Sequence, residues 1–285
     1  MKWTNRHNLP VPLCNAIVRA MSAYTRGDSD WSITQLLKPP RQTALEALHS
    51  DDLESDIADH IWIVLGIGLH QVLENSTEVM SEQRLFAELF GKRISGQIDY
   101  STDDAIIDYK TTTVWKVKDN KPSDEWVQQL NGYAMLKRMN NEPMPSRLEI
   151  VAILRDWSKL EASRDPSYPQ LQVQTIDIPI WNLDKTKAFF IERVIRHEEA
   201  KITLPECSNE ERWAKKPTWA VKKSKDAPRA VNGGLHNTET EAKDHAMRIC
   251  GHVEFRPGAN TRCDAYCSVS QFCSQYQALK GKKDE

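Results

Sequence analysis

Three charged residues in one short stretch have types and spacing suited to metal-dependent chemistry. The stretch GQIDYSTDDAIIDYKTT contains Asp99, followed by Asp108 and Lys110 two residues apart. Residues i and i+2 of a strand project from the same face, so Asp108 and Lys110 point together. Asp99 reaches that face if residues 101–104 form a hairpin turn. Two converging carboxylates make a hard oxygen site suited to Mg²⁺ or Mn²⁺, beside which a lysine can stabilise charge or position a water.

The same spacing also fits a surface hairpin with a cross-strand salt bridge. Two neighbouring helices strengthen the functional interpretation. His70 and Glu74 lie one turn apart before the hairpin, and Gln129 and Tyr133 lie one turn apart after it. A histidine on an apolar helix is more often a packed core residue than a ligand, so that alternative stays open for His70.

The elements that position these residues follow an alternating order. Helical periodicity predicts a helix over 56–75, with Ile61, Leu65, Leu69 and Val72 on its apolar stripe. Strand composition and turn residues predict strands at 83–89, 93–100, 105–113, 147–155 and 170–178, and further helices at 124–139 and 183–200. This order predicts an α/β fold with a mixed central sheet flanked by helices.

Four short motifs appear along this region in a fixed order, GIGLHQVLE, GQID, IDYKT and QLNGY. Together they resemble the motifs of the PD-(D/E)XK nuclease superfamily, in its RecB-type branch, which includes phage exonucleases and CRISPR-adaptation nucleases. The resemblance spans about residues 32–137 and returns in the C-terminal cysteines. It implies a restriction-endonuclease-like core.

The resemblance also implies roles for particular residues. The metal would be bound by His70, Asp99, Asp108 and the backbone carbonyl of Tyr109. The catalytic set would be Lys110, Asp108, Asp99 and, as an accessory acid, Glu82. Gln129 and Tyr133 would help to hold DNA. The implied reaction is hydrolysis of a phosphodiester bond assisted by Mg²⁺ or Mn²⁺.

Cysteines concentrate near the C-terminus in the spacing C-x3-C-x5-C, at Cys263, Cys267 and Cys273. Without an export signal, this grouping favours a metal or cluster site over disulfides. The candidates are a [4Fe-4S] cluster and a structural Zn²⁺, each needing a fourth ligand, and reduced thiols in a packed tail are the alternative.

Cluster-bearing RecB-type nucleases resemble this arrangement, but they commonly carry an upstream cysteine in an L-x-x-C-P-R-like segment. This chain reads LLKPPR there, with Pro39 at that position. Cys207 is therefore the first choice for the fourth ligand, Cys250 the second and Cys14 the third.

Composition limits the partners and the organisation. The 285 residues carry 38 basic and 40 acidic side chains, so contact with nucleic acid must be local. Lys116 and Lys118 follow the Asp108 strand and are candidate DNA contacts, with a solvated lysine face as the alternative. We expect an N-terminal helical segment at 1–57, a nuclease core at 58–205 and a small basic, cysteine-rich subdomain at 206–285.

These observations predict a metal-dependent DNA nuclease, foremost an exonuclease acting at DNA ends in phage or bacterial recombination. A recombinase or single-strand annealing protein is a possible partner. A non-catalytic DNA-binding or assembly protein on the same fold and a structure-specific endonuclease are the alternatives. The absence of a signal peptide or membrane segment predicts a cytoplasmic location without membrane contact, and the oligomeric state stays open.

Overall fold

The chain divides into two compact units in the computed structural model. One comprises Met1–Lys38 with Asp51–Thr203, and the other comprises Pro39–Ser50 with Leu204–Glu285. The structure describes residues 2–23, 25–74, 81–117 and 119–281, with the backbone alone at 74, 81 and 82. The first unit ends at Thr203, and residues 39–50 of the N-terminal stretch belong to the second unit.

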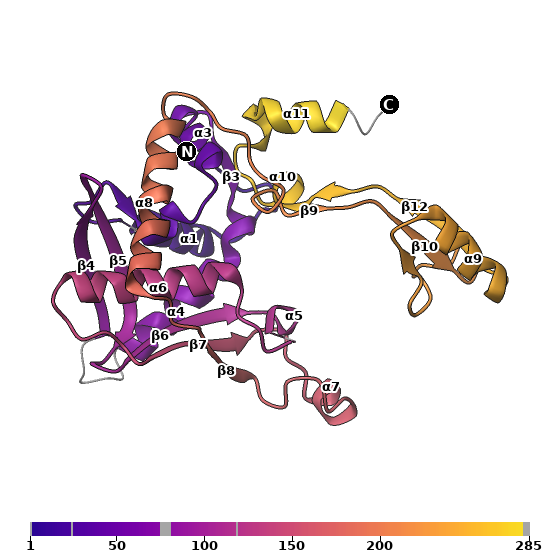
Figure 1. Ribbon diagram of the computed structural model, residues 1–285, viewed down its shortest axis with the longest axis horizontal. Helices are drawn as coiled ribbons and strands as arrows, with labels where there is room; N and C mark the ends of the chain where they lie inside the picture. The colour runs from indigo at the N-terminus through magenta and orange to yellow at the C-terminus, as the bar shows by residue number, and fades with distance from the viewer. Residues whose placement is uncertain (1, 24, 75–80, 118, 282–285) are drawn as a thin grey trace. The chain divides into compact units, whose positions relative to one another are not determined.

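A mixed six-stranded sheet forms the centre of the first unit (Figure 1). Its order is β2-β5-β6-β7-β8, and β4 pairs with β5 at one side. The strands are β2 (Trp31–Ser32), β4 (Ser81–Leu89), β5 (Lys92–Ser101), β6 (Ala105–Thr112), β7 (Arg147–Leu154) and β8 (Val173–Asp177). The β2/β5 and β6/β7 pairs are parallel, and the β4/β5, β5/β6 and β7/β8 pairs are antiparallel.

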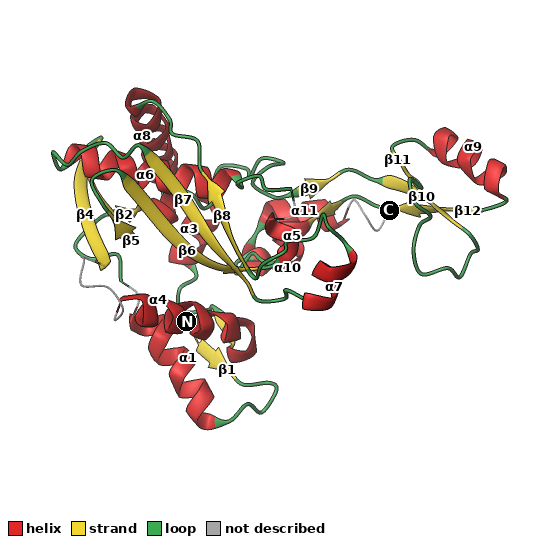
Figure 2. Cartoon of the chain, turned by 90° about the horizontal axis from the view of Figure 1, so that it is seen from below, coloured by secondary structure: helices red, strands yellow, loops and turns green. Residues whose placement is uncertain are grey.

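Helices flank this sheet, which confirms the predicted fold class. Helix α6 packs against β4, β5, β6 and β7, and α8 packs against α6. Figure 2 shows these two helices on one side of the sheet, with α1 and α4 gathered below it in that view. The helices of the first unit are α1 (Val11–Ala23), α2 (Ile33–Leu36), α4 (Ile61–Glu74), α5 (Val114–Val117), α6 (Asp124–Met139), α7 (Lys159–Arg164) and α8 (Leu183–Ala200).

Two short strands complete the first unit. β1 (Lys2–Thr4) and β3 (Glu54–Asp56) pair in parallel, and a 3₁₀ turn at Ile57–His60 leads into α4. The residues expected to be helical before position 57 thus include three short strands, and β2 among them joins the central sheet. A strand of two residues is too short to show a periodic pattern, so only its pairing with another strand defines it.

The close packing of α6 on β5 depends on Gly96. A Cβ at this position would lie 2.7 Å from Cδ1 of Leu136 and 2.9 Å from the ring of Tyr133. The glycine therefore lets the helix that carries Gln129 and Tyr133 approach the strand that carries Asp99. The predicted apolar stripe of α4 behaves differently, since Leu65 is 52% exposed and Val72 is 67% exposed.

The second unit combines a small helical part with short sheets. Its helices are α3 (Pro40–Leu48), α9 (Glu239–Ile249), α10 (Thr261–Ala265) and α11 (Ser274–Gly281), with a 3₁₀ turn at Ser270–Phe272. Its strands are β9 (Ala214–Lys215), β10 (Thr218–Lys222), β11 (Leu235–His236), β12 (His252–Arg256) and β13 (Ala259–Asn260). α9 packs on the three-stranded sheet through Val221, Ala242 and Ala246.

No helix in the described part of the chain is long and apolar enough to cross a membrane.

Candidate active site

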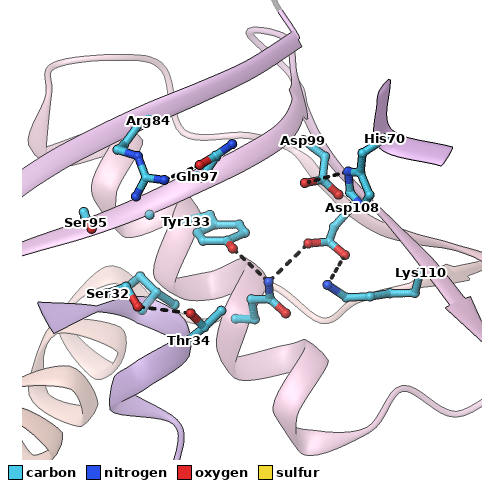
Figure 3. Close-up of a pocket in the computed structure, with 13 residues that line it drawn as sticks. Ser32, Thr34, His70, Arg84, Ser95, Gln97, Asp99, Asp108, Lys110 and Tyr133 are labelled. Atoms are coloured by element: carbon cyan, nitrogen blue, oxygen red, sulfur yellow. Dashed lines mark hydrogen bonds and ion pairs between the residues drawn. The ribbon is translucent and has the colours of Figure 1, made fainter. Parts of the chain in front are cut away.

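A cavity of about 290 Å³ in the first unit gathers most of the predicted site residues. It lies among α2, α4, β4, β5, β6 and α6 (Figure 3). Its lining consists of Ser32, Ile33, Thr34, His70, Arg84, Ser95, Gly96, Gln97, Asp99, Asp108, Lys110, Gln129 and Tyr133. Asp99, Asp108, Lys110, Gln129 and Tyr133, all singled out in the sequence, share this cavity with His70.

The β5–β6 hairpin brings the two aspartates together. Tyr100 pairs with Ile107, and continuing that register by one residue sets Asp99 across from Asp108. Oδ2 of Asp99 accepts a hydrogen bond of 2.9 Å from the backbone N–H of Tyr109. At this point the Asp99 side chain accepts a hydrogen bond that a backbone carbonyl of β5 would accept if the antiparallel pairing continued. The convergence that the predicted metal site requires is present.

Burial and the neighbouring carboxylate both change the pKa of Asp99. Burial is the larger cause and Asp108 the next, and together they raise the pKa of Asp99 to about 6. Two carboxylates held close in a poorly solvated place repel each other. A cation between them would relieve that repulsion, and this is the electrostatic setting in which a divalent ion binds well.

Asp108 is the most deeply buried charged residue of the cavity, with 1% of its surface exposed. Its Oδ1 accepts a hydrogen bond of 3.2 Å from Nε2 of Gln129. Its Oδ2 lies 2.7 Å from Nζ of Lys110 and forms an ion pair with it. A buried carboxylate that faces a second carboxylate and a lysine at the wall of a cavity is suited to binding a cation from that cavity.

Lys110 is held as an ammonium beside these carboxylates. Burial alone would lower its pKa, but the charges of Asp108 and Asp99 outweigh that effect and raise the pKa of Lys110. A lysine that keeps its proton acts by donating and by stabilising negative charge. It does not act as a base in this state.

His70 reaches the cavity from α4. Its Nδ1 lies 3.5 Å from Oδ1 of Asp99, and 29% of its side chain is exposed. The imidazole is thus at the cavity wall and outside the packed core, which answers the alternative that the sequence left open for this residue.

Gln129 and Tyr133 lie one turn apart on α6 and contact each other. Nε2 of Gln129 donates to the hydroxyl of Tyr133 over 2.8 Å as well as to Asp108. Both side chains are less than a tenth exposed. In this arrangement they fix the orientation of the Asp108 carboxylate, and their contact with DNA stays a prediction.

Some predicted site residues are not brought into the cavity. Lys116 lies outside the lining, with Nζ 5.5 Å from the centre of the Trp126 ring. Tyr109 donates its backbone N–H to Oδ2 of Asp99, and the role of its carbonyl as a metal ligand stays a prediction. Lys118 and the side chain of Glu82 fall outside the described residues.

The donor atoms suit a hard divalent cation, although they do not form a closed ligand shell. Within the described ranges, no three His, Cys, Asp or Glu side chains are placed so as to hold one ion. Mg²⁺ in proteins is usually held by one or two carboxylates and keeps several waters. The carboxylates of Asp99 and Asp108 fit that chemistry.

The structure adds cavity residues that the motifs did not reveal. Arg84 on β4 faces the cavity together with Ser32, Thr34, Ser95 and Gln97. One signal for Arg84 was available, since it lies in the predicted strand 83–89, which comes before GQID in the chain and pairs with it.

In the second unit, four cysteines line another cavity. These are Cys207, Cys263, Cys267 and Cys273. Burial is the largest cause that raises the pKa of Cys207 to about 12, and the nearby Cys273 and Cys263 add to it. Burial likewise raises the pKa of Cys263 and Cys267, with Cys273 contributing to both. The other two cysteines, Cys14 in α1 and Cys250 at the end of α9, are not part of this lining.

The LLKPPR segment contributes to the same cavity. Pro39 and Arg41 line it beside the cysteines. Arg41 is 6% exposed, its Nε donates to Sγ of Cys273 over 3.2 Å, and its Nη2 donates to Oγ of Ser274 over 2.8 Å. The position where the resemblance leads one to expect a cysteine is therefore part of the cysteine cavity, with proline in its place and Cys207 nearby in the same lining.

Comparison with known proteins adds little to this geometry. No protein-family model matches the chain, and no curated protein matches it. The crystal structure of SSO0001 aligns with a TM-score of 0.45 and 17% identity, over 70% of this chain and 90% of that chain. A crystal structure named "Putative exonuclease", from Eubacterium rectale, aligns with a TM-score of 0.33 and 16% identity, over 53% of this chain and 55% of that chain. Both TM-scores are too low for either likeness to identify the chemistry of this chain.

Proposed function

We propose that this protein is a divalent-metal-dependent DNA nuclease of the RecB-type branch of the PD-(D/E)XK superfamily. The observation that carries the proposal is the convergence of Asp99, Asp108, Lys110 and His70 in one cavity, where Asp108 is buried. The reaction is hydrolysis of phosphodiester bonds, foremost at DNA ends.

In this proposal Asp99 and Asp108 hold Mg²⁺ or Mn²⁺, with His70 and the carbonyl of Tyr109 completing the protein ligands. When bound, the ion would polarise the phosphate and lower the pKa of a coordinated water. Lys110 orients the attacking water and offsets the negative charge that develops on the phosphate. Gln129 and Tyr133 keep the Asp108 carboxylate aligned through the hydrogen bonds described above.

Cys207, Cys263, Cys267 and Cys273 line one cavity and are the proposed ligands of a cluster or metal. Burial raises the pKa of Cys207, Cys263 and Cys267, so these thiols would release protons on binding, and the free energy of binding would add to that of folding. We propose a [4Fe-4S] cluster with a structural role, and Zn²⁺ as the alternative. Iron and acid-labile sulfide in protein purified without oxygen would distinguish the two.

The proposed substrate is DNA with an accessible end, with Lys116 and Lys118 contacting its phosphates. The setting is phage or bacterial recombination or repair in the cytoplasm, with a recombinase or single-strand annealing protein as the partner. A non-catalytic DNA-binding protein on the same fold is the second candidate. The ion pair of Lys110 with the deeply buried Asp108 favours catalysis. A protein that only binds DNA has no need of a charged pair inside a cavity, where removing the charges from water is costly.

Digestion of labelled DNA tests the activity and its mode. Linear single strands, linear duplexes and closed circles are incubated with Mg²⁺ or Mn²⁺. We expect stepwise shortening of the linear forms by wild-type protein and intact circles. Cleavage of closed circles would favour the endonuclease alternative over the exonuclease. Binding without cleavage of any form would favour the non-catalytic candidate.

A further inference from the structure

A basic segment of the second unit has no role in the proposed hydrolysis. Residues 215–229, KKPTWAVKKSKDAPR, contain six basic residues and one acidic residue, in a chain whose basic and acidic residues number 38 and 40. The segment includes β10 and most of the loop that leads to β11. Its cations are therefore a local concentration of positive charge, and they are Lys215, Lys216, Lys222, Lys223, Lys225 and Arg229.

Five of these six cations lack an acidic partner. All except Lys222 are exposed, and none of the five forms an ion pair with any residue that the structure describes. Lys222 is 7% exposed, and its Nζ lies 2.8 Å from Oε2 of Glu254. The acidic residue of the segment, Asp226, is itself exposed. Cations that lie close together without counter-charges repel one another, and an anion bound among them relieves that repulsion.

The backbone of the segment is held in place by the sheet and by a helix. β10 lies between β11 and β12, and α9 packs beside them through Val221, Ala242 and Ala246 (Figure 1). The loop after β10 returns to the strand, since the N–H of Val231 donates to the carbonyl of Val221 over 2.8 Å. The Val231 side chain packs against the same apolar cluster. The cations thus extend from a fixed backbone, which limits the entropy that is lost when they bind a ligand.

The exposed cations form two groups, one at each end of β10. Lys215 and Lys216 come before the strand, and Lys223, Lys225 and Arg229 come after it. The extended chain between the two groups corresponds to about 20 Å. Phosphates follow one another every ~3.4 Å along the axis on each strand of a duplex, so the two groups can contact phosphates about six nucleotides apart. A polymer with evenly spaced negative charges therefore suits both groups at once.

We propose that residues 215–229 form a second DNA-binding surface, which contacts the phosphate backbone and does not read the base sequence. Lysine and arginine contacts to phosphates position DNA and carry no sequence information. DNA held at this surface stays on the same protein molecule after a cleavage event, so more nucleotides are released in each encounter. The binding itself is independent of the proposed nuclease function, and only this effect on cleavage rests on it.

Removal of the three cations that follow β10 tests this surface in the full-length protein. The variant Lys223→Gln/Lys225→Gln/Arg229→Gln is compared with wild type by fluorescence anisotropy, using labelled single strands and duplexes in EDTA at about 50 to 200 mM KCl. We expect the slope of log K against log salt to become shallower by about 3 for duplexes and by about 2 for single strands. The affinity at about 100 mM KCl should fall about 10- to 100-fold.

Lys159→Gln/Arg164→Gln/Lys185→Gln is the matched control, because it removes the same charge from exposed residues of the first unit. It is expected to keep the wild-type slope. A slope that is unchanged in the variant of the basic segment overturns the DNA-binding surface and leaves an acidic protein as the partner of these cations. A loss that the control shares, or one confined to a single DNA sequence, also overturns it.

Cleavage assays separate this inference from the proposed function. With Mg²⁺ or Mn²⁺ and an excess of unlabelled DNA as a trap, the variant of the basic segment should release fewer nucleotides per binding event, at the wild-type rate while the DNA is bound. Salt-dependent binding that requires the segment, in protein that never cleaves DNA, would refute the nuclease and leave the DNA-binding surface standing. Cleavage by a wild type and a variant with equal salt slopes would do the reverse.

Discussion

Asp99→Asn is expected to stabilise the metal-free protein at neutral pH. The aspartate has a pKa of about 6 in the folded protein, against 3.8 for the ordinary side chain, because it is buried and faces Asp108. The folded state therefore binds this proton more tightly than the unfolded state. Stability associated with Asp99 is present below about pH 4 and is lost as the pH rises through 6.

The expected gain in stability follows from the size of the pKa shift of Asp99. Two pKa units correspond to about 3 kcal/mol, which is an upper value because 14% of the side chain is exposed and Asp108 shares the repulsion. Asparagine keeps an oxygen that can accept from the Tyr109 amide, so the 2.9 Å hydrogen bond survives. We expect a gain of about 1–3 kcal/mol at pH 7.5 and about a third of that gain at pH 4.5.

Urea unfolding in EDTA at the two pH values measures this difference. Adding Mg²⁺ should raise the stability of wild type and leave Asp99→Asn nearly unchanged, since the variant lacks one of the proposed ligand charges. A variant that is less stable than wild type at pH 7.5, or equally shifted at both pH values, would refute the electrostatic reasoning. Asp103→Asn, in the exposed turn of the same hairpin, is the control and should be neutral.

Two further predictions concern packing and the cysteines. Gly96→Ala places a Cβ 2.7 Å from Leu136, so it should cost about 1–3 kcal/mol in thermal unfolding, whereas Gly68→Ala, with nothing within 4 Å, should be neutral or stabilising. Equal effects of the two would contradict the close approach of α6 to β5. Cys207→Ser should lower the bound iron or zinc measured by elemental analysis, and Cys14→Ser, outside the cysteine cavity, should leave it unchanged; full metal content in Cys207→Ser would exclude that thiol as a ligand.

The sequence predicted the regular elements of the core closely. α6 (Asp124–Met139) and α8 (Leu183–Ala200) begin and end at the predicted residues, because Ser123 and Asn182 cap their first turns. Strand composition and turns located β4 to β7 to within two residues at either end. Helix caps and turn residues are local signals, because each involves residues only a few positions apart in the chain.

Other features depended on tertiary contacts and could not be read locally. The two residues of β2 join the central sheet only by pairing with Ile94 and Ser95. The apolar residues of α4 predicted a buried stripe, but Leu65 and Val72 are exposed. Arg84 reaches the cavity through the pairing of β4 with β5, which no local pattern shows.

The candidate site was only partly accessible to sequence reasoning. The predicted hairpin placed Asp99 near Asp108. The four-residue spacing on the predicted helix 124–139 placed Gln129 beside Tyr133. The ion pair of Asp108 with Lys110 and its hydrogen bond from Gln129 depend on side-chain geometry, which the spacing of residues does not show.

The most direct test of the central claim is the rate at which Asp108→Asn releases nucleotides from end-labelled linear DNA in Mg²⁺ or Mn²⁺. Asparagine keeps the size of the buried side chain and removes its charge, and circular dichroism verifies the fold. We predict a rate more than about a thousandfold below wild type, with Asp103→Asn at the wild-type rate. Wild-type turnover by folded Asp108→Asn would contradict the assignment of this cavity as a nuclease active site.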